Sequence, residues 1–255
     1  MQNVLAIWQR EMKSYFVSPV AYVVLTIFLV LAGLFFFGNL EEIVRFTLTQ
    51  AQMGQDGPID VPAYVVRTLF DTLSVILLFL IPMLTMRLFA EERKQKTLEL
   101  LLTAPISNVQ TMLGKYLASL TFLAILLASV AFTISPLFIY GQPDIKPILS
   151  AYLGLFLYGA ALLALGLFIS TLTENQIIAV IITFGVSMTL WMVSILGSYA
   201  TGPTREVINY LSIISHLDDF IKGVIDTSHI VYYVTFAFVW LFLAHRSLES
   251  MRWRG

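Results

Sequence analysis

The chain has 255 residues, of which 58% are hydrophobic and only 12% are charged, about half the charged fraction of a typical soluble domain. Its mean hydropathy is +0.84, and no Asp, Glu, Lys or Arg occurs in 14–40, 116–143, 147–173, 175–204 or 227–245. Because a helix needs about 20 apolar residues to cross a bilayer, this composition excludes a soluble enzyme, a nucleic-acid-binding protein and a disordered scaffold. It predicts an all-α polytopic membrane protein that contacts the lipid bilayer.

The N-terminal residues 1–18 have an amphipathic pattern. At about 100° per residue, six apolar side chains share one arc of a helix and the polar side chains face away. The six are Val4, Leu5, Trp8, Met12, Tyr15 and Phe16. Aromatic and basic residues of this kind favour an interfacial helix in the cytoplasmic headgroup plane. A packed connecting helix would show the same pattern.

Six membrane spans are predicted, at 20–38, 69–89, 116–140, 148–171, 177–200 and 230–244. The first apolar stretch is too long for the core of a signal peptide, so it is interpreted as an uncleaved span. The second is the least obvious, because its charge-free part covers only 72–86 and contains Pro82, which a helix bundle in a membrane tolerates. No stretch outside the spans is long enough for a separate soluble domain, so residues 1–255 are expected to form a single transmembrane domain.

The distribution of Lys and Arg predicts the orientation. With six spans, one side of the membrane holds the N-terminus, the loop 87–115, the connection near Glu174 and the C-terminus. That side carries twice as many Lys and Arg residues as the other side. Because positively charged loops stay in the cytoplasm, both termini are expected to be cytoplasmic.

The segment 201–228 is a second amphipathic region, on the expected external side. It opens with Pro203, which suits the first turn of a helix. An apolar stripe follows, made of Val207, Ile208, Leu211, Ile214, Phe220, Ile221, Val224 and Ile225. The stripe predicts a segment that rests on the outer leaflet or re-enters it, although a packed connecting helix fits the pattern equally well.

The expected cytoplasmic loop 87–115 is the most charged part of the sequence. A polar run from Glu91 to Lys96 is followed by four leucines within five residues, with Glu99 among them. Ser107 and Gln110 have the spacing of a capping box, which predicts a helix start there. Exposed apolar patches usually mark contact sites, so the leucines indicate a cytoplasmic partner rather than a merely solvated loop.

The sequence lacks the motifs of an ATP-hydrolysing enzyme. A Walker A loop needs G-x-x-x-x-G-K-[ST], but the only Gly-Lys pair, Gly114-Lys115, is followed by Tyr116 and has Val109 at the position of the first glycine. We therefore expect no ATP hydrolysis by this chain and no cofactor in it. Any uphill transport must draw its energy from another chain.

The sequence also lacks motifs for other catalytic or metal-dependent chemistry. The chain has no cysteine and no H-E-x-x-H sequence, and its three histidines, His216, His229 and His245, lie in loops or at span ends. We interpret the neighbouring Ser215, His216 and Asp218 as a polar interruption between apolar helical turns, rather than as a catalytic triad. The spans carry no acidic or basic residue at bilayer depth, which disfavours an ion-coupled carrier.

The sequence resembles that of ABC-2-type exporter permeases. The run EERKQKTLELLLTAPIS at 91–107, followed by LGKYL at 113–117, is similar to the first cytoplasmic loop of these proteins. The runs IWQREMKSYFVSPVAYV at 7–23 and SHLDDFIKGVIDTSHIVYY at 215–233 resemble gliding-motility-associated GldF-like permeases. The resemblance covers essentially the whole chain. It implies a multi-pass protein of the bacterial cytoplasmic (inner) membrane.

The resemblance also implies partners. Two permease subunits, a homodimer or a pair of paralogues, would pass the substrate between them, and each would dock on a cytoplasmic ABC-type ATPase that binds ATP and Mg²⁺. A coupling helix would rest in a groove of that ATPase. The residues implied in the coupling contact are Glu91, Glu92, Arg93, Thr97, Leu98, Glu99, Leu100 and Leu101. Arg93 and Glu99 would make polar contacts, Thr97 would position the element, and the leucines would supply apolar contact.

Two alternatives remain open at this stage. The first is a non-transporting membrane subunit that transmits ATPase-driven motion to an envelope complex, with a periplasmic Gld-type domain protein as a further partner. The second is a secondary carrier that works alone. Small residues at Gly159, Ala160, Ala164, Gly166 and Ser170, and Gly185 with Gly197, are candidates for close helix packing.

Overall fold

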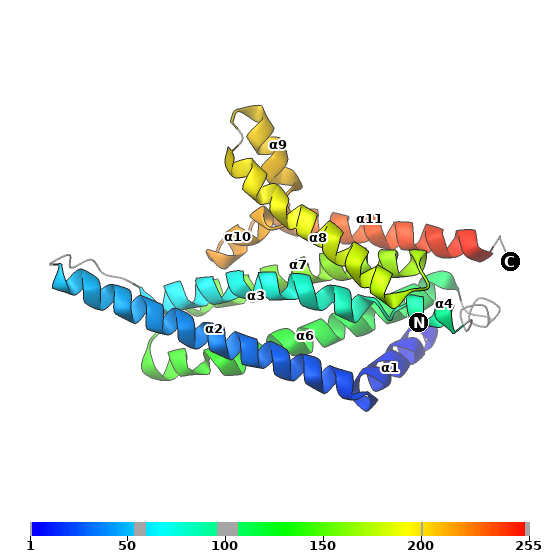
Figure 1. Cartoon of the computed structure of the whole chain (residues 1–255), viewed down its shortest axis with the longest axis horizontal. Helices are drawn as coiled ribbons and strands as arrows, with labels where there is room; N and C mark the ends of the chain where they lie inside the picture. The colour runs from blue at the N-terminus through cyan, green and yellow to red at the C-terminus, as the bar shows by residue number, and fades with distance from the viewer. Residues whose placement is uncertain (1, 54–59, 96–106, 200, 253–255) are drawn as a thin grey trace.

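The structure is a computed structural model that describes residues 2–53, 60–95, 107–199 and 201–252. The described residues form helices joined by short connections, without a strand (Figure 1). In chain order the helices are α1 (Gln2–Val17), α2 (Pro19–Gln52), α3 (Val61–Thr85), α4 (Ala90–Lys94), α6 (Asn108–Tyr140), α7 (Ile145–Leu172), α8 (Gln176–Tyr199), α9 (Pro203–Leu211), α10 (Ser215–Ile221) and α11 (Thr227–Arg252).

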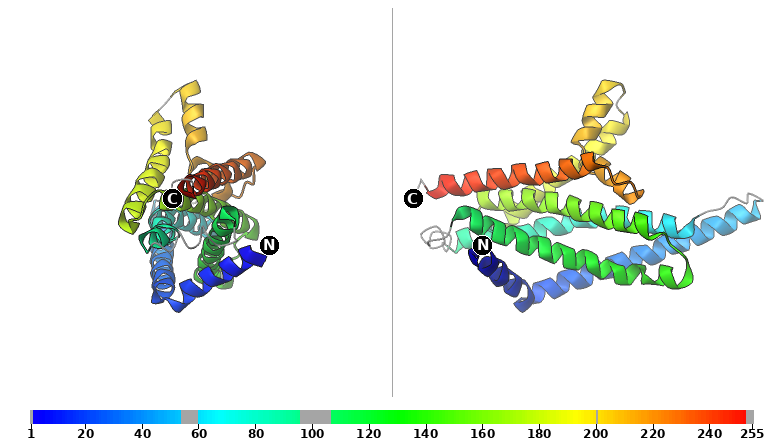
Figure 2. Two further views of the ribbon diagram at one scale, coloured as in Figure 1. Left: turned by 90° about the vertical axis from the view of Figure 1, so that its right-hand side faces the viewer. Right: turned by 180° about the vertical axis from the view of Figure 1, so that it is seen from behind.

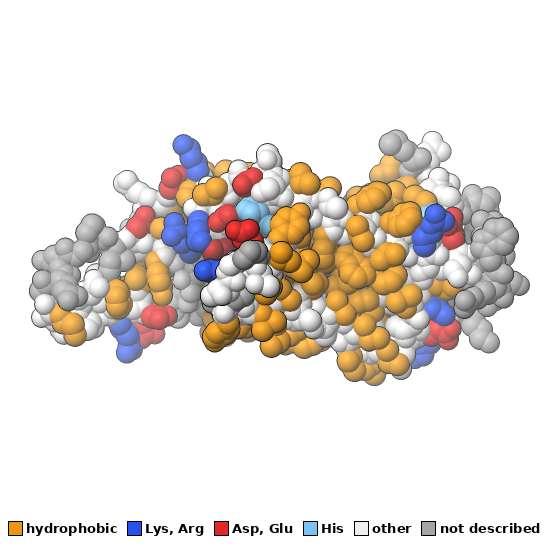
Figure 3. All heavy atoms as spheres, turned by 90° about the horizontal axis from the view of Figure 1, so that it is seen from above, with side chains coloured by type: hydrophobic (Ala, Val, Ile, Leu, Met, Phe, Trp, Pro, Cys, Tyr) orange, Lys and Arg blue, Asp and Glu red, His pale blue; other side chains and the backbone are white. Residues whose placement is uncertain are grey.

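Within these described ranges, six helices are long and apolar enough to cross a membrane, which confirms the predicted number and the all-α class. They are α2, α3, α6, α7, α8 and α11. Figure 3 shows hydrophobic side chains over the middle of one face and charged side chains toward its two ends. This distribution suits a bundle whose middle lies among lipid tails.

The helix boundaries differ from the predicted spans most clearly in α2 and α3. Beyond 38, α2 continues to Gln52, and Arg45 Nη2 lies 2.6 Å from Glu41 Oε1 on its exposed surface. The predicted span 69–89 is displaced, because α3 begins at Val61, where the N–H of Ala63 donates to the Asp60 side chain, and ends at Thr85. A charge-free stretch indicates the apolar part of a span, whereas caps and ion pairs decide where its helix ends.

The central helix is α7, which packs against α3, α6, α8, α10 and α11. Its glycines permit this close approach. A Cβ at Gly154, Gly159 or Gly166 would lie 2.4 Å from Phe220 Cβ, 2.6 Å from Leu123 Cδ2 and 2.2 Å from Thr85 Oγ1, respectively. The predicted close packing in this helix is therefore confirmed. Gly185 has no close neighbour among the described residues, because a Cβ there meets nothing within 4 Å, whereas Gly197 packs closely on α9, where a Cβ would lie 2.3 Å from Asn209 Oδ1.

The helix α1 packs against α6. Ile7 is buried at this contact, Trp8 Nε1 donates to Thr121 Oγ1 at 3.0 Å, and Tyr15 stacks on Phe122 at 5.3 Å between ring centroids. The predicted amphipathic helix is present, and most of its apolar arc faces protein. Leu5 is the exception, with 57% of its surface exposed.

The segment 201–228 forms two short helices rather than one stripe. In α10, Leu217, Phe220 and Ile221 are buried, and this helix packs on α7. In α9, Val207 and Leu211 stay exposed, and this helix packs beside α8. Figures 1 and 2 show α8 and α9 leaning away from the bundle, on the side opposite α1. The single stripe was wrong because the chain bends between the two helices and turns the two apolar faces differently.

Candidate functional site

One end of the bundle, here called the terminal end, holds the N-terminus, α4 and the end of α11 (Figure 1). The predicted coupling residues Glu91, Glu92 and Arg93 belong to α4. The other predicted coupling residues, Thr97, Leu98, Glu99, Leu100 and Leu101, lie outside the described residues. The site is therefore built from α4 and the helices that hold it.

Four charged side chains at the terminal end form what we call the ionic cluster: Arg10, Glu11, Glu92 and Lys115. Lys115 has only 2% of its side chain exposed, and its Nζ lies 3.0 Å from Glu11 Oε1 and 3.0 Å from Glu92 Oε1. Arg10 Nη2 lies 2.8 Å from Glu11 Oε1 and 3.1 Å from Glu92 Oε1. Two cations thus match two carboxylates, so the cluster joins α1, α4 and α6 without a net charge.

A glycine places α1 close enough to α6 for these contacts. A Cβ at Gly114 would lie 2.7 Å from Ile7 Cγ2, so only glycine allows Ile7 to rest there. Glu11 follows Ile7 by four residues and therefore lies on the same face of α1, one turn further along. Glu11 reaches Lys115, the residue after Gly114, in this way. The Ser107–Gln110 capping box, which is confirmed, determines where α6 begins.

The partners of Glu11 keep it ionised. Burial is the largest single influence and would raise the pKa of this carboxyl group. Lys115 and Arg10 act against burial through charge and hydrogen bonds, and together they hold the pKa of Glu11 below its usual value. The hydrogen bond to Glu11 is in turn the main reason that the pKa of Arg10 is raised. Glu11 and Arg10 therefore stay charged at neutral pH.

The start of α4 is anchored to α7 by a serine. The N–H groups of Phe89 and Ala90 donate to Ser170 Oγ at 2.9 and 3.1 Å, and both residues are fully buried. The α4 helix has no side-chain cap of its own, so Ser170 provides the acceptor that the first turn of a helix needs. The Phe89 ring also lies 5.3 Å from Lys115 Nζ, which continues the contact to the ionic cluster.

Arg93 ties the other side of α4 to the end of α7. Its Nη1 donates to the carbonyl oxygen of Thr171 at 2.8 Å, and its Nη2 donates to Glu174 Oε1 at 3.1 Å. Thr171 Oγ1 in turn donates to Ser247 Oγ of α11 at 3.0 Å. The short α4 helix is thus connected through Glu92 to α1 and α6, and through Arg93 to α7 and then α11.

The sequence reasoning missed most of this site. Glu92 and Arg93 were predicted as contacts to a partner, and the structure also brings them into contacts within the chain. Glu91 Oε1 accepts a hydrogen bond from Gln95 Nε2, just after α4, at 3.4 Å. Lys115 was considered in the charge distribution, the failed Walker A motif and the LGKYL run, but not as a partner of Glu11 and Glu92. A lysine inside an otherwise apolar helix was the available signal, because a buried lysine requires an acidic partner.

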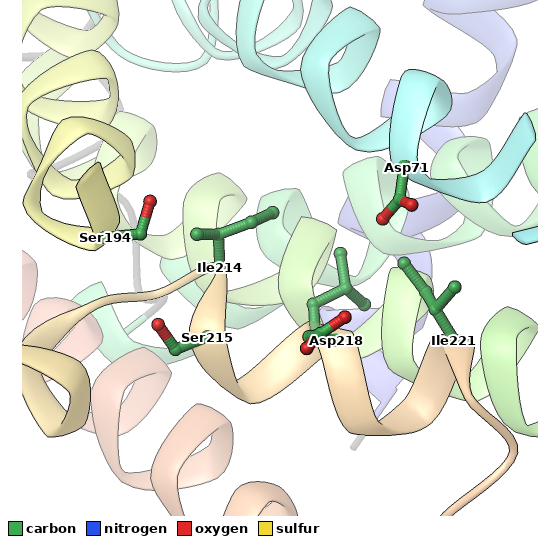
Figure 4. Close-up of a pocket in the computed structure, with 7 residues that line it drawn as sticks. Asp71, Ser194, Ile214, Ser215, Asp218 and Ile221 are labelled. Atoms are coloured by element: carbon green, nitrogen blue, oxygen red, sulfur yellow. The ribbon is translucent and has the colours of Figure 1, made fainter. Parts of the chain in front are cut away.

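The opposite end of the bundle carries a pocket of about 240 Å³ between α3, α8 and α10. Figure 4 shows that Asp71 of α3 and Asp218 of α10 both border this pocket. Asp218 also pairs with Lys222, one turn further along. Among the residues that the structure describes, no group of three or more His, Asp or Glu side chains is placed to hold a metal ion.

Comparison with known proteins agrees with this architecture. The family model of the ABC-2 family transporter protein matches residues 60–244, more than two thirds of the chain, from the start of α3 to within α11. No curated protein matches the chain. Members of this family are permease subunits of ABC transporters and work with an ATPase, which agrees with the absence of a Walker A motif. With its six apolar helices and this match, the chain belongs to the ABC-2 transporter family as a multi-pass membrane permease.

Proposed function

We propose that this permease exports its substrate with energy from a separate cytoplasmic ABC-type ATPase, and that the ATPase docks on α4 and the leucine-rich segment after it. The terminal end then faces the cytoplasm of a bacterial inner membrane. The Lys and Arg distribution supports this orientation. The permease itself needs no cofactor, because ATP and Mg²⁺ bind to the partner.

The observation that carries the proposal is the double attachment of α4. Glu92 contacts Lys115 and Arg10, whereas Arg93 contacts Thr171 and Glu174. A docking element that is fixed on both sides cannot move alone. A displacement of α4 by an ATPase would therefore pull on α1 and α6 through one set of contacts and on α7 and α11 through the other.

In this proposal α4 and the segment that follows it supply the docking contacts. Glu91, Glu92, Arg93, Thr97 and Glu99 give polar groups, and Leu98, Leu100 and Leu101 give an apolar surface. A fully buried Leu contributes about 1.5–3 kcal/mol, so two or three of them can sustain a specific contact with a groove.

A second permease subunit, either an identical copy or a paralogue, completes the substrate path in this proposal. At most 22% of the most apolar stretch of α2, α8 and α11 is buried, so many apolar side chains of these helices are exposed or half-buried. Lipid and a second permease are the partners that suit such surfaces in a membrane. The residues 7–23 and 215–233 support a GldF-like subgroup, and no sequence feature identifies the substrate.

The test is binding of the cognate ABC-type ATPase, measured with both proteins purified in detergent or nanodiscs. Replacing Glu99 with Lys, or Leu100 and Leu101 with Asp, should weaken binding at least about tenfold, because roughly 1.4 kcal/mol corresponds to a factor of ten. Asp144→Lys, at the opposite end, is the matched control and should bind normally. Unaltered binding by inserted, folded Glu99 and leucine variants would show that the ATPase docks elsewhere.

Transport is tested separately in proteoliposomes that contain permease and ATPase. ATP-dependent loss of a substrate from the cytoplasmic side supports export. If ATP hydrolysis is stimulated by the permease while no candidate substrate moves, the complex transmits motion to an envelope partner instead. Transport that follows an ion gradient without the ATPase would identify a secondary carrier.

A further inference from the structure

Two histidines at the opposite end of the bundle share a very short contact. His216 of α10 and His229 of α11 place their Nδ1 atoms 2.7 Å apart. His216 Nε2 lies 3.0 Å from the carbonyl oxygen of Tyr210, and His229 Nε2 lies 2.9 Å from Asp219 Oδ2. All four ring nitrogens of the two imidazoles are therefore used in one chain of hydrogen bonds, from Tyr210 to Asp219.

Only one number of protons satisfies this chain of hydrogen bonds. A carbonyl and a carboxylate only accept, so both Nε2 atoms must carry a proton. The Nδ1–Nδ1 contact needs one further proton between the two rings. Three protons on two imidazoles make one ring neutral and the other cationic, and Asp219 beside the pair balances the charge. This result holds whichever ring carries the extra proton.

Adding a proton to the two rings, or removing one, breaks this chain of hydrogen bonds. A fourth proton places two N–H groups face to face and two positive charges side by side, so the Nδ1–Nδ1 contact must open. Removal of the third proton leaves two lone pairs facing each other, either between the rings, at the Tyr210 carbonyl or at Asp219. The geometry therefore requires one bound proton that the two rings share.

The surroundings of the two histidines show why a positive charge on both rings is unfavourable. His216 is buried, and the Tyr232 ring stacks on it at 3.8 Å between centroids. Burial is the main cause of a lowered pKa of His216, and His229 adds to it, while the Tyr210 carbonyl and Asp219 oppose it. The other ionisable groups that the described residues place around the pair are Glu206 and Tyr210 on α9, Asp218 on α10, and Tyr232 and Tyr233 on α11, with Asp226 just before α11. Lys222, which follows α10, pairs with Asp218, and Asp71 on α3 borders the neighbouring pocket together with Asp218.

The pair is accessible to protons. It borders a pocket of about 510 Å³, together with Glu206 and Tyr210 of α9 and Asp218 of α10. Figure 3 shows histidine atoms at the surface beside acidic side chains. The pair also connects two helices, because Tyr210 lies in the last turn of α9 and His229 lies in the first turn of α11. Beside it, Tyr232 and Tyr233 donate to the carbonyl oxygens of Leu211 and Ile213 at 3.2 and 2.7 Å.

We propose that His216 and His229 form a proton-binding site that latches the α9–α10 corner onto the first turn of α11 and releases it in acid, when the pair takes up a second proton. While the shared proton is bound, the latch stays closed. The α10 helix stays on α7 after release, because Gly154 packs directly against Phe220. Acid therefore frees the corner from α11, while α10 stays on α7 and α9 stays beside α8. The inference does not depend on the identity of the ATPase or the substrate.

The first test uses the unmodified chain labelled with ¹⁵N-histidine in nanodiscs. The chain has three histidines, so His245 serves as a reference within the same molecule. The latch predicts that His216 and His229 titrate together in two separated steps. The step in which the pair takes up its second proton should lie below the usual histidine pKa of about 6.5. Two independent single-step titrations would overturn the proposal.

The second test measures the opening of the corner. Ser212 is fully buried between α9 and α10, whereas Thr204 on α9 is exposed. In this cysteine-free chain, the labelling rate of Ser212→Cys divided by that of Thr204→Cys cancels the effect of pH on the thiol reagent. The ratio should rise on acidification by up to about tenfold per pH unit, the limit for uptake of one proton.

The control for the second test is His216→Gln, whose amide keeps hydrogen-bonding capacity without titrating. In this background the ratio should not depend on pH, whether the corner is closed or permanently open. A flat ratio in the parent would overturn the latch. So would an equal rise in the parent and in the His216→Gln background, and the ¹⁵N titration decides the question if His216→Gln fails to fold.

Discussion

Lys115 Nζ and Glu11 Oε1 lie 3.0 Å apart, although 104 residues separate them in the chain. The contact joins α1 to α6 at a place where the lysine side chain is almost completely shielded from solvent. Glu92 of α4 meets the same ammonium group at 3.0 Å. One buried cation thus holds the N-terminal helix and the docking element together, which gives the ionic cluster consequences for both stability and coupling.

Replacing Lys115 with Met should destabilise the permease by about 3–5 kcal/mol, because Glu11 and Glu92 would then share Arg10 alone and one buried negative charge would be left uncompensated. The measurement is the unfolding transition in detergent, followed by intrinsic Trp fluorescence. The combined variant Lys115→Met and Glu11→Gln removes one cation and one carboxylate, leaves Arg10 paired with Glu92, and should recover most of this loss.

The combined variant also separates stability from coupling. If α4 transmits motion through the ionic cluster, this variant should bind the ATPase normally but stimulate its hydrolysis less than the parent does. Full stimulation in a stable combined variant would show that the cluster serves stability alone.

The ionic cluster should make stability depend on acid. The pKa of Glu11 is lower in the folded chain than its usual value of 4.5, so the unfolded chain binds the proton more readily. This contribution to stability is therefore complete above about pH 4.5 and is lost as the pH falls through the lower, folded-state pKa. Unfolding midpoints measured across this range should fall less steeply for Glu11→Gln than for the parent, and parallel curves would contradict the assignment.

The glycines of α7 and α8 should respond to substitution in opposite directions. Gly166→Ala places a Cβ 2.2 Å from Thr85 Oγ1 of α3, and such overpacking costs about 1–3 kcal/mol. Gly185→Ala adds a Cβ in open space on a helix and should be neutral or stabilise the chain by up to about 1 kcal/mol. Equal unfolding midpoints for these two variants would mean that the α3–α7 contact is looser than described.

The orientation can be tested with single cysteines, since the chain has none of its own. Cysteines at Asn108 and Ser250, at the terminal end, should be protected from impermeant thiol reagents applied to intact cells. Cysteines at Gln52 and Asp144, at the opposite end, should be labelled. Labelling at Ser250 without permeabilisation would place the C-terminus outside and contradict an even number of spans.

The sequence by itself determined the number of spans and the chemical class of the protein. A long apolar stretch without charges must become a helix in a bilayer whatever its neighbours are, so the spans could be predicted from composition alone. The capping box at Ser107 and Gln110 is equally local and was also predictable. The glycine-rich part of α7 indicated close packing, because a missing side chain permits a close neighbour wherever that neighbour comes from.

Only the tertiary structure decided which distant groups meet. Glu11, Glu92 and Lys115 come from three helices, and their contact depends on Ile7 resting on Gly114 rather than on any spacing in the sequence. His216 and His229 looked like loop histidines until the bend between α9 and α10 brought their rings together. Side chains that act through space are positioned by packing between helices, and a pattern along one helix contains no information about the partner that it will meet.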